Sequence, residues 1–244
     1  MLPLLLLAGS LAHAQSLPAG APWALRRGLQ AAPAPSAPPP DCARHPARSP
    51  VACGCAASRA PPHFNLSFAT TAGAFSLRVA RADAPLGADR LHALSACGDY
   101  LGASLERGNE NAFFRVVPGF VVQFGISGAP AVSQAWEGLV LANDAPNKLS
   151  NVRGTLAYAA EQDAAGRACN RTTQVYINYA DNSRLDALGF TVIGVVDDMA
   201  AVDAIVAKWA QEPDQDEIYS QGNAYLARSF PGLSYINSTL VTAA

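Results

Sequence analysis

Residues 113–125 say more about the fold of this chain than any other segment of its sequence. They read Phe-Phe-Arg-Val-Val-Pro-Gly-Phe-Val-Val-Gln-Phe-Gly, so one guanidinium and one carboxamide interrupt a run of aromatic and β-branched side chains. Such side chains favour strands, and Pro118-Gly119 predicts a turn between two of them. Val121 and Gln123 then share one face of the second strand, because side chains alternate. We expect Arg115 to reach that face, where a cation and an amide above an apolar floor would hold and polarise a peptide bond.

The order of residues in this stretch resembles the central signature of the cyclophilin-type peptidyl-prolyl isomerases. That signature runs Phe-His-Arg, two aliphatic residues, Pro-Gly-Phe, two further residues and Gln-x-Gly. The matching residues are Phe113, Arg115, Pro118, Gly119, Phe120, Gln123 and Gly125, while Phe114 replaces the His. The alternative is a buried β segment whose Arg makes only a local salt bridge. Further family blocks favour the resemblance, because residues 151–159, 171–178 and 182–194 resemble them in the family's order.

The patterns around this stretch indicate an all-β protein. Apolar residues alternate over residues 64–68 and 75–79, which predicts a β-hairpin. A helix is expected to open at Asp83-Ala84-Pro85, with Asp83 as its cap and Pro85 in its first turn, and residues 199–209 carry apolar side chains at helical spacing. The resemblance implies the cyclophilin fold, a closed eight-stranded antiparallel barrel capped by two α-helices.

Composition divides the chain into three parts. Residues 1–14 combine a short apolar run with Ala12-His13-Ala14, which is typical of a secretory signal peptide, although a basic n-region is missing and a fraying apolar tail is the alternative. Residues 15–62 are rich in Pro, Ala and Arg and predict a disordered linker or an organelle transit segment. Residues 63–244 form the predicted isomerase domain, with a C-terminal extension over residues 221–236. We expect a lumenal or secreted protein of the secretory pathway, or alternatively a protein of an organelle such as a plastid.

Five cysteines make disulfides conceivable behind a signal peptide, and their odd number leaves at least one thiol without an intramolecular partner. They are Cys42, Cys53, Cys55, Cys97 and Cys169. His45 is the one further metal ligand near the first three, so a metal site is disfavoured. N-glycosylation sequons begin at Asn65, Asn170 and Asn237, a pattern that also arises by chance.

Several classes of function are disfavoured. A net charge of −2 with 15% charged residues does not provide the basic surface of a nucleic-acid-binding protein. After the N-terminus, no apolar run reaches the roughly 18 residues of a membrane span. Gly-rich phosphate motifs are absent, and no His follows His92, which argues against a His-dependent hydrolase. We therefore expect no cofactor and no metal, and a monomer whose partners are proline-containing segments of client proteins.

Prolyl isomerisation needs neither a nucleophile nor a metal. Rotation about a peptide bond costs about 18–20 kcal/mol because resonance stiffens the C–N bond. We expect Arg115 to stabilise the twisted amide, since guanidinium stays charged, and Gln123 to orient the substrate carbonyl or the guanidinium. The resemblance implies substrate contacts by Phe120, Val121, Gln174, Tyr176, Leu185 and Phe190.

Four departures from the family pattern stand beside this site. Arg184 replaces a Trp that contacts cyclosporin, which predicts weakened binding of that drug. Phe190 replaces a His, Ala160 replaces an Asn that binds peptide backbone, and Arg171-Thr172 replaces Asn-Gly. These changes remove polar contacts to the peptide, so we expect activity with reduced affinity or altered specificity. A module that binds proline peptides without useful turnover, or a scaffold tethered by the linker, is the alternative.

Overall fold

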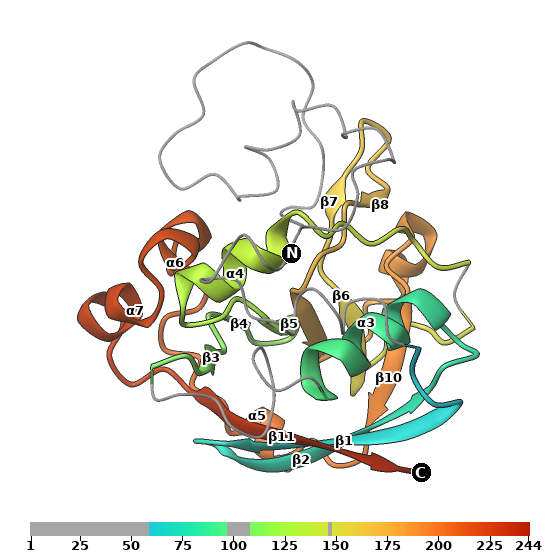
Figure 1. Cartoon of the computed structure of the whole chain (residues 1–244), viewed down its shortest axis with the longest axis horizontal. Coiled ribbons are helices and arrows are strands. Elements are labelled where there is room, and N and C mark those ends of the chain that lie inside the picture. Colours follow the sequence, from blue (N-terminus) through green and yellow to red (C-terminus); the bar gives the residue numbers. More distant parts are fainter. Residues whose placement is uncertain (1–58, 97–107, 146–147) are drawn as a thin grey trace, which may run out of the picture.

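The computed structural model describes residues 59–96, 108–145 and 148–244 (Figure 1). The predicted signal peptide, the linker up to residue 58, and four cysteines (Cys42, Cys53, Cys55 and Cys97) lie outside the described residues. Within them, Cys169 is a free thiol. Ala60 is buried and its amide donates to Asp89 at 2.8 Å, so the packed chain already includes residues before the predicted boundary at 63. No helix of the described ranges has the length and apolar character to cross a bilayer.

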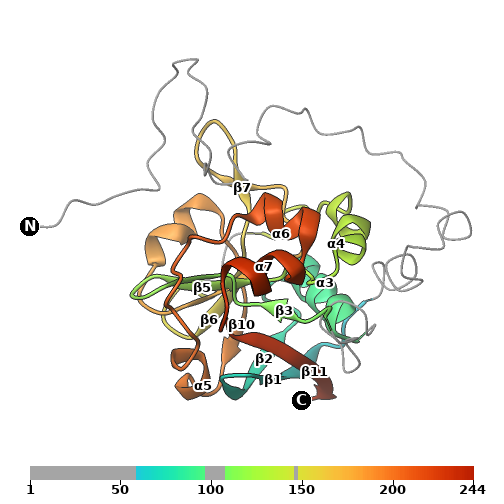
Figure 2. The ribbon, with the colours of Figure 1, turned by 90° about the vertical axis from the view of Figure 1, so that its left-hand side faces the viewer.

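One curled antiparallel sheet forms a half-barrel that makes up the body of the protein (Figures 1 and 2). In the order of pairing, its nine strands are β3 (Asn111–Ala112), β11 (Tyr235–Ala243), β1 (His63–Thr70), β2 (Gly73–Ala80), β10 (Val192–Val196), β6 (Thr155–Tyr158), β9 (Val175–Asn178), β5 (Val121–Phe124) and β4 (Arg115–Val117). A separate two-stranded ribbon pairs β7 (Glu161–Gln162) with β8 (Ala168–Cys169).

The predicted mostly-β architecture is confirmed, whereas closure of an eight-stranded barrel is not. The sheet ends at β3 and β4, and no backbone pairing joins these two strands in the described part of the chain. The Phe113 amide between them donates to the Ser234 carbonyl at 3.0 Å, and the Val116 amide donates to the Ala210 carbonyl at 2.7 Å. Backbone carbonyls of two C-terminal segments thus accept hydrogen bonds from amides near the unpaired edges of β3 and β4.

The predicted hairpin is confirmed. β1 pairs with β2 from His63 opposite Ala80 to Thr70 opposite Gly73. Its buried face contributes Phe64, Leu66 and Phe68 to the main core, as the alternation predicted. Apolar burial of this kind contributes about 25 cal/mol for each Å² removed from water.

Helix α3 (Pro85–Ala96) begins where the sequence predicted, but a different residue caps it. Asp144 accepts hydrogen bonds from the amides of Leu86 and Gly87 at 2.7 and 3.0 Å, so it takes the role expected of Asp83. Arg171 binds the same carboxylate and holds it at the helix N-terminus, where negative charge is favourable.

The second predicted helix is much shorter than its apolar spacing indicated. Helix α5 covers only Ala200–Asp203. In a longer α-helix the Val206 amide would bond to the Val202 carbonyl. Instead, the Tyr179 hydroxyl donates to that carbonyl at 2.9 Å and the Val206 amide donates to the Ser234 hydroxyl at 3.1 Å. Contacts with other segments therefore end the helix early.

Two C-terminal helices, α6 (Gln215–Gln221) and α7 (Asn223–Ser229), lie against the end of the sheet that contains β3 (Figure 2). They form a second apolar core with residues near β3 and β5, namely Ala112, Phe114, Ile126, Ile218, Tyr219, Leu226, Phe230 and Leu233. Helix α4 (Pro130–Glu137) and the 3₁₀-helix η3 (Ser183–Leu188) complete the described elements. The extension that the sequence left without a role thus packs beside the strands of the predicted site.

Candidate active site

The hairpin of β4 and β5 places Arg115 directly opposite Gln123. Pro118 and Gly119 form its turn, closed by a 3.0 Å hydrogen bond from the Phe120 amide to the Val117 carbonyl. Gly119 has a φ of 74°, which suits glycine at the third position of such a turn. Because opposite residues of a pair interact across the strands, Arg115 Nη1 donates to Gln123 Oε1 at 3.1 Å. The predicted pairing of cation and amide is present.

A chain of side-chain hydrogen bonds continues from this pair into the protein. Gln123 Nε2 donates to Gln174 Oε1 at 2.7 Å, and Gln174 Nε2 donates to the Tyr219 hydroxyl at 3.3 Å. Both amide side chains are buried. Gly125, directly after β5, lets the backbone lie close to Thr173 and Gln174, since an added Cβ would lie 2.5 Å from the Thr173 carbonyl oxygen. The two glutamines are thereby fixed in orientation.

Sequence reasoning missed two residues of this arrangement, and both come from the C-terminal part of the chain. Tyr219 on α6 is the last member of the hydrogen-bond chain, and Gln211 Oε1 accepts a bond from Arg115 Nη2 at 3.4 Å. No periodicity marks either residue. The block that resembles a C-terminal extension begins only at Gln221, so it includes neither of them.

An apolar cluster adjoins the chain of hydrogen bonds and brings together the residues predicted to form the proline pocket. It contains the predicted residues Val121, Tyr176, Leu185 and Phe190, all buried, with Phe120 half-buried against them. Tyr176 lies opposite Gln123 in the pairing of β5 with β9, so pocket and amide share one face of the sheet. The rings of Tyr176 and Phe190 meet edge to face with centroids 6.3 Å apart.

Asn151 fixes the floor of this cluster, a role that the sequence did not indicate. Its Oδ1 accepts a bond from the Tyr176 hydroxyl at 2.9 Å, and its Nδ2 donates to Asp186 and to the Phe190 carbonyl, each at 2.7 Å. Burial raises the pKa of Tyr176 well above its usual range, with the Asp186 charge acting in the same direction. Tyr176 is therefore a neutral, immobilised ring.

Two guanidiniums flank the Phe120 ring at the rim of the cluster. Arg115 Cζ lies 5.7 Å and Arg184 Cζ 5.1 Å from its centroid. Burial lowers the pKa of Arg115, yet an arginine keeps its charge at any physiological pH. The partners of Arg115 are the neutral amides of Gln123 and Gln211, and no ion pair joins it to a carboxylate in the ranges that the structure describes. A charged donor thus stands beside an apolar cluster.

The family model of cyclophilin type peptidyl-prolyl cis-trans isomerases matches residues 65–222, which is well over half of the sequence. The chain belongs to this family. The matched range includes the hairpin of β4 and β5, the apolar cluster and α6, so all residues described above lie within it.

Named relatives agree with this assignment. The chain is 38% identical over 114 residues to Peptidyl-prolyl cis-trans isomerase A of Dickeya dadantii, covering 44% of this chain and 55% of that protein. It is 36% identical over 105 residues to Peptidyl-prolyl cis-trans isomerase B of Escherichia coli, covering 40% of this chain and 61% of that protein. The alignments thus span about half of these relatives.

A solved structure supports the fold. The crystal structure of a cyclophilin type isomerase from Cryptosporidium parvum aligns with a TM-score of 0.52 at 17% identity, covering 75% of this chain and 99% of that one. At such low identity the likeness concerns the fold alone.

The departures from the cyclophilin pattern occupy different places. Phe190 is buried in the apolar cluster and Ala160 packs half-buried beside it, so both put apolar groups where the family has polar ones. The Arg171 side chain is directed into the protein, where it is 1% exposed and bonded to Asp144 at 3.0 Å. Its side chain therefore belongs to the structural framework.

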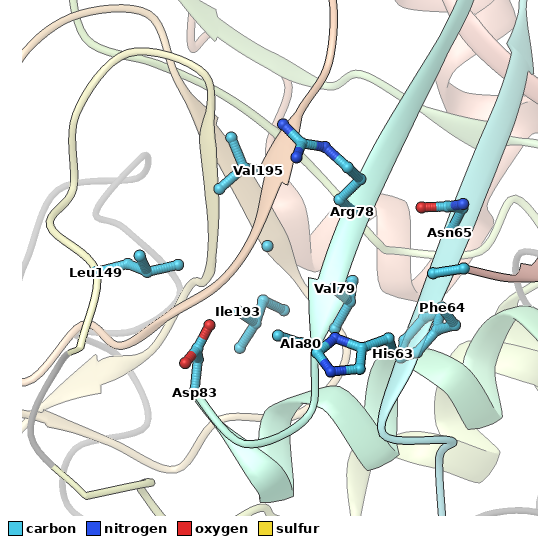
Figure 3. Close-up of a pocket in the computed structure, with 12 residues that line it drawn as sticks. His63, Phe64, Asn65, Arg78, Val79, Ala80, Asp83, Leu149, Ile193 and Val195 are labelled. Carbon is cyan, nitrogen blue, oxygen red and sulfur yellow. The ribbon is translucent and has the colours of Figure 1, made fainter.

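A hollow of about 420 Å³ lies away from this cluster, along β1, β2 and β10 (Figure 3). His63, Asn65, Arg78, Asp83 and Leu149 are among its lining residues, and none of the predicted site residues lines it. Arg78 at its edge is exposed and forms an ion pair with Asp197. Arg78 thus provides an exposed, carboxylate-paired arginine with which Arg115 and Arg184 can be compared.

Proposed function

We propose that this protein is a peptidyl-prolyl cis-trans isomerase that accelerates rotation about Xaa-Pro bonds in client proteins. One observation carries the proposal: Arg115, whose hydrogen bonds within the described residues go to the neutral amides of Gln123 and Gln211, stands at the rim of an apolar cluster with six buried side chains. Such a site offers a ring pocket and a charge, which are the two things that this reaction requires.

The chemistry follows from the electronic structure of the amide. As the C–N bond twists, resonance is lost and the nitrogen gains a lone pair that accepts hydrogen bonds more strongly. A donor that binds this state better than the planar state lowers the barrier. Arg115 would be this donor, and its bond to Gln123 limits the directions in which the guanidinium can point.

The apolar cluster would hold the proline ring while the rest of the chain turns. The half-buried Phe120 ring lies against the buried side chains of this cluster, among them Val121 and Tyr176. A proline ring that packs here would leave water, which is favourable for an apolar group. The Cryptosporidium parvum relative, at 17% identity and TM-score 0.52, has also been solved in the presence of the dipeptide Ala-Pro, which supports proline as the ligand.

A module that binds proline peptides with little turnover is the second candidate. Phe190 and Ala160 favour it, because they lack the polar groups that would hold the peptide backbone during rotation. The hydrogen bond from Arg115 to Gln123, which orients the guanidinium, favours the enzyme.

The deciding experiment measures isomerisation of a short Xaa-Pro peptide by the full chain and by its Arg115→Ala variant. Loss of one such donor typically costs about 10²–10³ in rate, so we expect the variant to lose at least about a hundredfold in kcat/KM. Arg78→Ala, which removes an exposed arginine paired with Asp197, is the matched control and should retain full activity. Equal, negligible rates from all three folded proteins, together with peptide binding, would establish the binding module instead.

The destination of the protein and its binding of cyclosporin are two further proposals. We propose passage through the secretory pathway, with a plastid-like organelle as the alternative destination, from residues 1–62; a reporter fused to this segment tests it. We also propose weakened cyclosporin binding, because Arg184 stands where the family pattern has Trp. Titration with the drug before and after Arg184→Trp tests this second proposal.

A further inference from the structure

Arg184 lies at the edge of the apolar cluster and forms no ion pair with a carboxylate of the described residues. It precedes the buried pocket residue Leu185 in η3, is itself exposed, and lies with Cζ 5.1 Å from the Phe120 ring centroid. Its Nη1 donates to Asn182 Oδ1 at 2.9 Å, and Asn182 Nδ2 donates to the Phe120 carbonyl at 2.9 Å. The guanidinium is thereby tied to the turn that carries the predicted substrate contacts.

The acidic groups on the same element are engaged elsewhere. The Asp181 carboxylate accepts a bond from the Ser183 amide at 2.9 Å, and the Arg184 charge is a minor cause of its lowered pKa. Asp186 accepts bonds from Ser150 and Asn151. No ion pair joins either carboxylate to Arg184 in the described part of the chain.

Arg115 adds a second positive charge at the same ring, with its Cζ 5.7 Å from the Phe120 centroid. Two guanidiniums therefore flank one aromatic side chain, although the whole chain has a net charge of −2. A peptide lying in the cluster would meet this local positive field on the side of Phe120.

We propose that Arg184 is a specificity-determining residue that makes the site prefer proline segments carrying an Asp or Glu next to the proline. This inference rests on the proposed function, since it assumes that peptides occupy the cluster around Phe120. A guanidinium offers paired donors that match a carboxylate, and both bonds can form without displacing an existing acidic partner. Lysine or arginine near the proline would meet repulsion from two like charges.

The test compares peptides of one length that carry Glu, Gln or Lys at each of the two positions on either side of the proline. Both turnover and equilibrium binding are measured with the full chain. Exposed ion pairs are worth up to about 1 kcal/mol, so we expect Glu to exceed Gln by about two- to fivefold in at least one position, with Lys below Gln. The preference should shrink as salt is raised, because exposed charges are screened.

Three variants identify the residue responsible. Arg184→Gln should abolish the preference for Glu, Arg184→Glu should reverse it toward Lys, and Arg184→Lys should keep it in part. Arg78→Gln is the matched loss of an exposed arginine distant in the sequence from η3 and should leave the Glu-to-Gln ratio unchanged.

The outcomes separate this inference from the proposed function. Identical Glu-to-Gln ratios for the wild type and Arg184→Gln at every position would overturn the role of Arg184, whatever the turnover. Absence of turnover with an Arg184-dependent preference in binding would instead overturn the isomerase while supporting the inference.

Discussion

Arg171 and Arg115 are both withdrawn from water to a large degree, yet their partners differ in kind. Arg171 is 1% exposed and bonds through Nη1 to the equally buried carboxylate of Asp144 at 3.0 Å. It also donates to the Ala142 carbonyl and lies over the Tyr158 ring. Arg115 donates to two amide oxygens, those of Gln123 and Gln211.

This difference separates a structural cation from the proposed catalytic one. The charge of Arg171 is neutralised where it stands, and the ion pair ties the segment before residue 145 to the N-terminus of α3. The charge of Arg115 is oriented by neutral groups, so its field remains available to a substrate. A guanidinium held by amides at the edge of a pocket thus indicates a binding or catalytic role more strongly than burial does.

Removing the acidic partner of the structural cation should have the largest effect. In Asp144→Asn, the buried Arg171 loses its carboxylate and the amides of Leu86 and Gly87 lose a charged acceptor. Breaking a buried pair in this way costs about 3–5 kcal/mol, which urea denaturation would measure as a fall in the free energy of unfolding.

The matched control for that experiment is Asp197→Asn, which breaks the exposed ion pair with Arg78 and should cost less than about 1 kcal/mol. A similar small loss in both variants would contradict the structural role of the Asp144–Arg171 pair.

Gln211→Glu would give Arg115 a carboxylate partner, as Arg171 has in Asp144. The new carboxylate would stand next to Arg115 Nη2, which is 3.4 Å from Gln211 Oε1, and would neutralise part of its charge. We expect kcat/KM to fall by about three- to tenfold, in line with about 0.7–1.4 kcal/mol for a partly exposed charge pair. Gln211→Ala removes the same hydrogen bond without adding charge and should fall by less; equal effects would show that charge is not what matters.

Tyr219→Phe tests the far end of the hydrogen-bond chain with a smaller perturbation. The variant removes the hydroxyl to which Gln174 Nε2 donates at 3.3 Å, a bond worth about 0.5–1.5 kcal/mol. As a positioning residue, Tyr219 should affect kcat by about two- to fivefold and KM little, with altered amide signals of Gln123 and Gln174 in NMR spectra.

Tyr225→Phe on α7 provides the comparison, because its hydroxyl accepts a bond from the Asp214 amide at 3.2 Å and does not take part in the chain. It should leave kcat and the glutamine signals unchanged. Identical kcat losses in both tyrosine variants would reduce Tyr219 to a packing residue of the second core.

What could be predicted from the sequence follows the range of the interactions involved. Arg115 and Gln123 are eight residues apart with a turn between them, so strand periodicity and Pro118-Gly119 sufficed to pair them. The apolar cluster draws on β5, β9 and η3, and only the resemblance to a family could bring Val121, Tyr176 and Leu185 together in advance.

The remaining features depend on single hydrogen bonds between distant segments, which leave no periodic signal. Asp144 caps α3 through the amide of Leu86, 58 residues earlier, and the Tyr179 and Ser234 hydroxyls end α5 by taking its backbone partners. Tyr219 joins the site from 45 residues beyond Gln174. Local propensity says nothing about such contacts, because they are decided by tertiary packing.

The smallest effect concerns pH, and it follows from the same neutral surroundings of Arg115. Burial raises the pKa of Tyr176, so the tyrosine stays neutral from about pH 6 to 9. Burial lowers the pKa of Arg115, but an arginine starts so far above this range that it stays protonated throughout it. With Phe190 in place of the family's His, kcat/KM should change by less than about twofold over this range. Phe190→His should add a transition near the usual His pKa of about 6.5; such a transition already present in the wild type would show that a titrating group outside this set controls the site.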